Sequence, residues 1–203
     1  MFDVPRVPIK YHEAITASAN AKGCMDVDTV KGCSAGMSAK EGGCYGECYA
    51  AKIAERYGLA FGQSVVRGFV DRWQHRDILV RQIRQHPLTW YRIGVMGDPS
   101  HAWDHTIAVI RNLRPAQKTA VIVTKHWKPL SDDNLSQLLE LDVVFNTSNS
   151  ALDTEAQMRY RVGQYERLAH YGIKSVNRVV TCQFGDTEWG RAAKERQDYL
   201  LSL

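Results

Sequence analysis

Cysteine is the residue type of this chain that points most directly to a particular chemistry. Four of its five cysteines lie within 25 residues of one another, at Cys24, Cys33, Cys44 and Cys48. Thiolates are soft ligands that bind iron–sulfur clusters, zinc or copper(I). Because the first residues show no charged-then-apolar export signal, we expect this group to bind metal or to carry out redox chemistry rather than to form disulfides.

Three of these cysteines share a glycine-rich segment, with the spacing Cys33-x10-Cys44-x3-Cys48. A structural zinc site would need all four cysteines, or three with a histidine, and its usual C-x2-C pairs are missing from this sequence. A cluster held by three cysteines leaves one iron open to a further ligand, and the glycines would let the backbone donate N–H groups to its sulfurs. We interpret Cys24 as a buried thiol on the first predicted strand, while zinc remains the alternative metal.

Two histidines, His101 and His105, are spaced so that they could share one helix face and bind a metal ion. No glutamate follows His101, so the motif of hydrolytic zinc enzymes is missing. We therefore interpret both, together with His126, as histidines that face solvent or substrate.

The elements that must position these side chains are strands alternating with helices. Strands are predicted at 25–30, 90–96, 119–124, 141–146 and 175–181, and helices at 47–57, 62–85, 101–113, 132–140, 151–171 and 188–200. This alternation predicts parallel βαβ units. Five visible strands are too few for an eight-fold barrel. We expect an open, partial βα barrel of five to six parallel strands, with a doubly wound sheet as the alternative.

The chain is expected to form a single domain over residues 1–203. Residues 1–23 are predicted as an irregular lead-in, 24–183 as the βα core with the cysteine loop at 31–48, and 184–203 as a C-terminal helix. The hydrophobic fraction of 44% suits a packed core, and the net charge of +4 permits an anionic partner without requiring one. No apolar run approaches the ~20 residues of a membrane helix, so we expect no membrane association and a cytoplasmic location.

Polar side chains follow the predicted strands at their carboxyl ends, where parallel α/β folds bind ligands. The residues in question are Gly97, Asp98, Thr124, Lys125, Asn146, Ser148 and Cys182. Loops at strand ends are polar in most proteins, so the pattern alone does not distinguish a binding site from ordinary loops. Cys182 is interpreted either as a core thiol or as a catalytic thiol facing the ligand.

A cysteine loop directly after a first strand, followed by a helix and further βα units, resembles the radical S-adenosylmethionine (SAM) superfamily. The usual motif of that superfamily is C-x3-C-x2-C, from which the present spacing departs. The likeness is closer to phage- and bacterium-borne radical-SAM-like proteins of unassigned function, which carry Gly-Cys, a variable gap and Cys-x2/3-Cys-Tyr-Ala. The matching residues here are Gly32-Cys33 and Gly43-Cys44-Tyr45-Gly46-Glu47-Cys48-Tyr49-Ala50.

Two shorter elements extend this likeness over roughly residues 24–183. One strand ends in an acidic residue, as in Met96-Gly97-Asp98, and a later strand ends in Thr-Lys, as in Thr124-Lys125. The resemblance implies that Cys33, Cys44 and Cys48 bind a [4Fe-4S] cluster whose fourth iron takes the amino and carboxylate groups of SAM. It implies reduction by a low-potential donor such as flavodoxin or ferredoxin. SAM would then be cleaved reductively to methionine and a 5′-deoxyadenosyl radical, which abstracts hydrogen from an unidentified substrate.

The resemblance also suggests roles for the residues at the strand ends. Gly97 and Asp98 would meet the SAM amino group, and Lys125, next to Thr124, would meet its carboxylate. Asn146 and Ser148 would bind the ribose hydroxyls. Cys182 and Lys125 are the candidate catalytic residues.

The open mouth of a small barrel suits a large substrate such as a nucleic acid or a peptide. Two other functions stay open on the sequence. One is a zinc-stabilised nucleic-acid-binding or scaffold protein without catalysis. The other is an iron–sulfur protein that binds SAM for non-radical chemistry.

Overall fold

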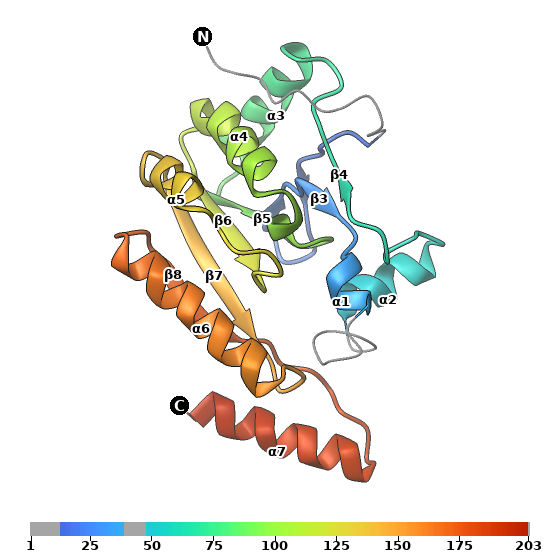
Figure 1. Ribbon diagram of the computed structural model, residues 1–203. Coiled ribbons are helices and arrows are strands. Elements are labelled where there is room, and N and C mark those ends of the chain that lie inside the picture. The colour runs from blue at the N-terminus through green and yellow to red at the C-terminus, as the bar shows by residue number, and fades with distance from the viewer. Residues whose placement is uncertain (1–12, 39–47, 203) are drawn as a thin grey trace.

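The computed structural model describes residues 13–38 and 48–202, which form an α/β fold (Figure 1). Cys44 lies outside the described residues, and so does the middle of the predicted cysteine loop. Six of the described strands form one mostly parallel sheet in the order β1-β2-β5-β6-β7-β8. Only β1 runs antiparallel to its neighbour, β2. The predicted α/β class with parallel strands is therefore confirmed.

The strands of this sheet are short at one edge and longer at the other. They are β1 (Ser18–Ala19), β2 (Met25–Asp26), β5 (Trp90–Ile93), β6 (Thr119–Thr124), β7 (Val143–Asn149) and β8 (Ser175–Val179). A separate antiparallel pair consists of β3 (Val30–Lys31) and β4 (Val65–Val66). A parallel bridge between Gly32 and Gly97 places this pair next to the chain that leaves β5.

The helices include three that each connect two neighbouring parallel strands. These are α4 (Trp103–Leu113), α5 (Asp132–Leu139) and α6 (Glu155–His170). The others are α1 (Ser34–Ser38), α2 (Tyr49–Arg56), α3 (Gln74–Gln85) and α7 (Glu188–Ser202), with single 3-10 turns η1 (Pro99–Ala102) and η2 (Arg114–Ala116). None of the helices in the described part of the chain is long and apolar enough to span a membrane.

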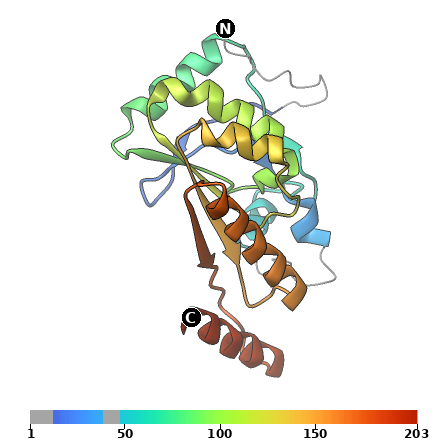
Figure 2. The ribbon, with the colours of Figure 1, turned by 60° about the vertical axis from the view of Figure 1, so that its left-hand side comes forward.

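The connecting helices cover one face of the sheet. From β5 onward each strand lies beside the one before it, so right-handed crossovers place α4, α5 and α6 on the same side. Figure 2 shows these helices together on that side. The strand residues that face them are buried, including Ile93, Ile122 and Phe145. Alternate residues such as Arg92, Val121 and Val144 are only half-buried, which differs from a doubly wound sheet with helices on both faces.

The two predicted helices at 132–140 and 151–171 begin with well-formed caps. Ser131 and Asn134 exchange side-chain and backbone hydrogen bonds at the start of α5, and Thr154 and Gln157 do the same at the start of α6. Such reciprocal pairs satisfy N–H groups that the first helical turn leaves unpaired. The helix start predicted at Ser131 is therefore confirmed, and α6 begins four residues later than predicted.

Other predicted elements were wrong in part, and the strand predicted at 90–96 ends at Ile93. The helix predicted at 62–85 is helical only from Gln74, because Val65 and Val66 pair with β3 instead. The strand predicted at 25–30 divides into β2 and β3, which belong to different sheets. The strand predicted at 141–146 begins at Val143 and continues to Asn149, so residues expected in a loop pair with β8.

Candidate functional site

A pocket lies at the carboxyl ends of β5 to β8, where α1 and α2 approach the sheet. Its volume is about 180 Å³ and it is open on one side, so a larger ligand would extend through its mouth. The lining includes most of the residues that the sequence singled out, namely Cys33, Cys48, Gly97, Asp98, Thr124, Lys125, Ser148 and Cys182. Strand-end residues far apart in the sequence are thus gathered with two of the three predicted metal-binding cysteines.

One predicted site residue, Asn146, is not brought to this pocket, and Cys24, interpreted as a buried thiol on a strand, is half-buried just before a strand. Asn146 lies on β7 two residues before Ser148, which places it roughly 7 Å further from the carboxyl end of the strand. Cys24 precedes β2, at the opposite, amino end of the parallel strands, where its N–H donates to Asn20 Oδ1 over 3.2 Å. The third predicted metal-binding cysteine, Cys44, lies outside the described residues.

Cys33 and Cys48 belong to one small apolar cluster. Cys33 is buried against Ala50, Ala54 and Phe61, and Cys48, at the N-cap position of α2, packs on the same cluster. Burial raises the pKa of the Cys33 thiol to about 12. In the absence of a metal Cys33 is therefore protonated at neutral pH, and its thiolate needs a cation to replace the lost hydration. In residues 13–38 and 48–202 no three His, Cys, Asp or Glu side chains are grouped closely enough to hold a metal ion.

A buried carboxylate shapes the chain that leaves β5. Asp28 accepts hydrogen bonds from the backbone N–H groups of Gly94, Val95 and Met96 at 3.0, 2.8 and 2.9 Å. Burial raises the pKa of Asp28, while the three N–H groups favour its charged form. Asp28 was predicted to lie in a strand, with no role in the site, although an acidic residue inside an apolar segment is a usable signal.

The same turn holds the residues beside both cysteines. The carbonyl oxygen of Met96 accepts the N–H of Gly32 at 2.7 Å, and that of Val95 accepts the Tyr49 hydroxyl at 2.9 Å. Gly97 approaches the cysteine segment so closely that a Cβ there would lie 2.4 Å from the carbonyl oxygen of Val30. Asp28 thus holds this turn in place, and the turn helps to position Cys33 and Cys48.

Asp98 joins the ends of two neighbouring strands. Its Oδ1 accepts from the Ser100 N–H at 2.9 Å and from the Thr124 hydroxyl at 2.7 Å, and its Oδ2 accepts from the Lys125 N–H at 2.8 Å. Asp98 therefore has a structural role that the sequence did not reveal. Oδ2 accepts one of these bonds, so it can still receive a donor from a ligand.

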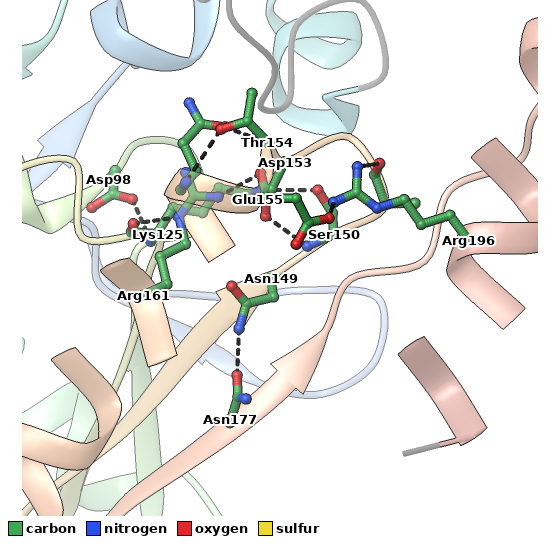
Figure 3. Close-up of polar contacts among 12 residues, drawn as sticks. Asp98, Lys125, Asn149, Ser150, Asp153, Thr154, Glu155, Arg161, Asn177 and Arg196 are labelled. Carbon is green, nitrogen blue, oxygen red and sulfur yellow. Dashed lines mark hydrogen bonds and ion pairs between the residues drawn. The ribbon is translucent and has the colours of Figure 1, made fainter. Parts of the chain in front are cut away.

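Lys125 belongs to a buried cluster of charges at the rim of the pocket (Figure 3). Its Nζ donates to Ser150 Oγ at 3.0 Å and to Asp153 Oδ1 at 2.7 Å. Arg161 reaches the same carboxylate at 2.5 Å and donates through Nε to the Lys125 carbonyl oxygen at 2.8 Å. Burial alone would raise the pKa of Asp153, but the two cations hold it below its usual value. Asp153 and Arg161 were not predicted as site residues, because their contacts with Lys125 join the turn after β6 to α6 and the turn before it, 28 and 36 residues along the chain.

The turn after β6 directs two side chains toward the pocket. His126 has a φ of 52°, a left-handed backbone conformation that side chains other than glycine rarely adopt. Its neighbours Lys125 and Trp127 both line the pocket, whereas the His126 ring is buried against Trp103 and Phe145. The prediction that His126 faces solvent or substrate was wrong. Burial lowers its pKa to about 4, so it is neutral at pH 7.

Ser148 and Cys182 complete the strand-end side of the pocket. Ser148 is buried, and its Oγ has no hydrogen-bond partner among the described residues. Buried hydroxyls are nearly always paired, so a ligand or water is the natural partner for this one. Cys182 is held through its backbone by Gln197 of α7, which accepts its N–H at 2.7 Å and donates to its carbonyl oxygen at 3.3 Å.

Comparisons of the chain with protein-family models, with curated proteins and with solved structures find no match.

Proposed function

We propose that the chain is a radical SAM enzyme whose sheet forms the wall of an open, partial βα barrel. Cys33, Cys44 and Cys48 would hold a [4Fe-4S] cluster, and SAM would bind across the carboxyl ends of β5 to β7. The observation that carries this proposal is the shared pocket of Cys33, Cys48 and the strand-end residues Asp98 and Lys125.

The described residues fit such a group in three respects. The backbone N–H of Gly36 donates to Cys33 Sγ at 3.3 Å, the kind of contact that stabilises cluster thiolates. A Cβ at Gly36 would lie 3.0 Å from the same sulfur, so any other residue would have to displace that sulfur by a few tenths of an ångström. The unpartnered Ser148 hydroxyl offers a hydrogen bond to a ligand in the pocket.

When bound, the cluster and SAM would supply one-electron chemistry that ends in hydrogen abstraction from a substrate. The chain would bind and orient SAM. Lys125 has three N–H donors and uses two of them on Ser150 and Asp153, which leaves one for a carboxylate. Asp98 Oδ2 would accept from the SAM ammonium, and Ser148 would bind a ribose hydroxyl. The apolar cluster around Cys33 would keep water away from the sulfurs.

The experiment that tests this proposal is a SAM cleavage assay under anaerobic conditions. The reconstituted chain is incubated with SAM and dithionite, and we expect 5′-deoxyadenosine and methionine to form. Cys48→Ser serves as the inactive control, since it removes one ligand while keeping a similar volume. A cluster-containing chain that releases no 5′-deoxyadenosine would instead support an iron–sulfur protein with non-radical chemistry.

A further inference from the structure

Three nitrogen-bearing groups surround the sulfur of Cys33. The backbone N–H of Gly36 lies 3.3 Å from it, and the Nε2 atom of His101 lies 3.7 Å from it. The Trp127 ring packs against the same cluster as Cys33, and its indole N–H lowers the pKa of the Cys33 thiol. One buried sulfur is therefore flanked by nitrogen groups from α1, from η1 and from the turn after β6.

Each of the two side-chain donors is held by contacts of its own. The backbone N–H of His101 donates to the Asp98 carbonyl oxygen at 3.2 Å, and its own carbonyl oxygen accepts Lys128 Nζ at 3.3 Å. The Trp127 ring lies under the Arg161 guanidinium, whose central carbon is 4.9 Å from the ring centroid. Both side chains are thus held beside the sulfur before any metal arrives. His101 donates to a charged Cys33 in the tautomer that carries its proton on Nε2.

A neutral thiol gains little from three donors, because its sulfur is only a weak acceptor. A thiolate gains far more, since hydrogen bonds to a charged acceptor are about twice as strong as neutral ones. The arrangement around Cys33 therefore favours the form in which this sulfur binds metal. Hydrogen bonds to cluster sulfurs also stabilise the more negative, reduced state, and so set the reduction potential.

We propose that His101 and Trp127 are positioning residues, which donate N–H groups to the metal-bound thiolate of Cys33 and raise the reduction potential of the cluster. This inference rests on the proposed function. The inference gives a role to His101, which was predicted to face solvent or substrate, and to Trp127, for which no contact with sulfur was predicted.

The test is a redox titration of the reconstituted full-length chain, followed by electron paramagnetic resonance, together with the iron content of each variant. His101→Leu and Trp127→Phe each remove one donor and keep a side chain of similar size. We expect each to lower the ratio of reduced to oxidised cluster at a fixed potential by about threefold, which corresponds to about 28 mV for one electron.

Two further variants separate a donor effect from a packing effect. His101→Gln keeps an N–H at a similar reach, so its potential should return toward that of the unaltered chain. His170→Leu changes an exposed histidine at the end of α6, remote from the pocket, and should shift nothing. Loss of iron from both donor-deficient variants leaves the decision to His101→Gln. If His101→Gln retains its iron, the donor role is supported, and if it also loses its iron, the donor role is overturned.

The remaining outcomes distinguish this inference from the proposed function. Full iron content with unchanged potentials in His101→Leu and Trp127→Phe would overturn the inference and leave the proposed function standing. An unaltered chain that takes up no iron would overturn the proposed function, and this inference with it.

Discussion

At the scale of single residues, the site depends on side chains whose charge state is set by burial. Cys33 is a neutral thiol until a metal binds, whereas Asp153 stays charged because Lys125 and Arg161 face it. His126 is neutral because it is buried between aromatic rings. The charge of each of these groups at a given pH therefore depends on how the pocket buries or pairs it.

The first prediction concerns the pH dependence that His126 gives to stability. Its pKa is lowered from 6.5 to about 4 in the folded chain, so the unfolded chain binds the proton first as the pH falls. The stabilisation is fully present above pH 6.5 and is lost progressively toward pH 4. Urea unfolding should show a loss of about 3 kcal/mol over this interval that is attributable to this histidine.

The matched variant for this prediction is His126→Asn, because asparagine accepts the left-handed backbone and does not titrate here. Its free energy of unfolding should change less between these pH values than that of the unaltered chain. Because His101 and His105 also have lowered pKa values, only the difference between the two chains reports on His126. Parallel pH curves for the two chains would contradict the prediction.

At the scale of elements, the turn after β5 organises the pocket. It donates three N–H groups to the Asp28 carboxylate, and two of its carbonyl oxygens accept hydrogen bonds from the residues beside Cys33 and Cys48. These contacts join the segments that carry both cysteines to a single turn.

Replacing Asp28 by asparagine should weaken both the fold and metal retention. The amide keeps the shape of the carboxylate but loses one of its oxygens, so buried N–H groups of the turn lose their acceptor. We expect about 3 kcal/mol less stability by urea unfolding and a lower iron content after gel filtration with a chelator. Asp26→Asn is the control, because Asp26 pairs with Arg92 on β5 and does not contact the turn. Equal iron loss in both variants would contradict the role assigned to Asp28.

The glycine at position 97 gives a second prediction at this scale. In Gly97→Ala the added Cβ would meet the Val30 carbonyl oxygen at 2.4 Å, so the cysteine segment must move away from β5. We expect a loss of about 2 kcal/mol of stability in thermal or urea unfolding. Gly163→Ala in α6 meets nothing within 4 Å and should instead stabilise the chain by about 0.5–1 kcal/mol. A stable Gly97→Ala chain would show that the close approach is not required.

At the scale of the whole molecule, sequence patterns predicted most of the regular elements. The apolar run of β6 and the capped start of α5 depend on neighbouring residues, and both were predicted within one residue. The failures arose where distant segments decide the local structure. Val65 and Val66 form a strand because β3 is available to pair with them, and the local sequence contains no sign of that partner.

The candidate site, too, was predicted from the sequence only in part. The strand-end residues Asp98, Lys125 and Ser148 were identified from strand order alone, because parallel strands place their carboxyl ends together. The contacts that fix them were not identified. Asp28 binds a turn some 66–68 residues away, and Arg161 meets Lys125 across 36 residues. Such pairs follow from the packed fold and leave no periodic signal in the sequence.

The metal content of the anaerobically purified chain tests the central claim most directly. We predict brown protein with about four irons per chain, lost on replacing Cys33, Cys44 or Cys48 by alanine and largely retained in Cys24→Ala. Colourless protein with about one zinc per chain, equally dependent on all four cysteines, would contradict the account.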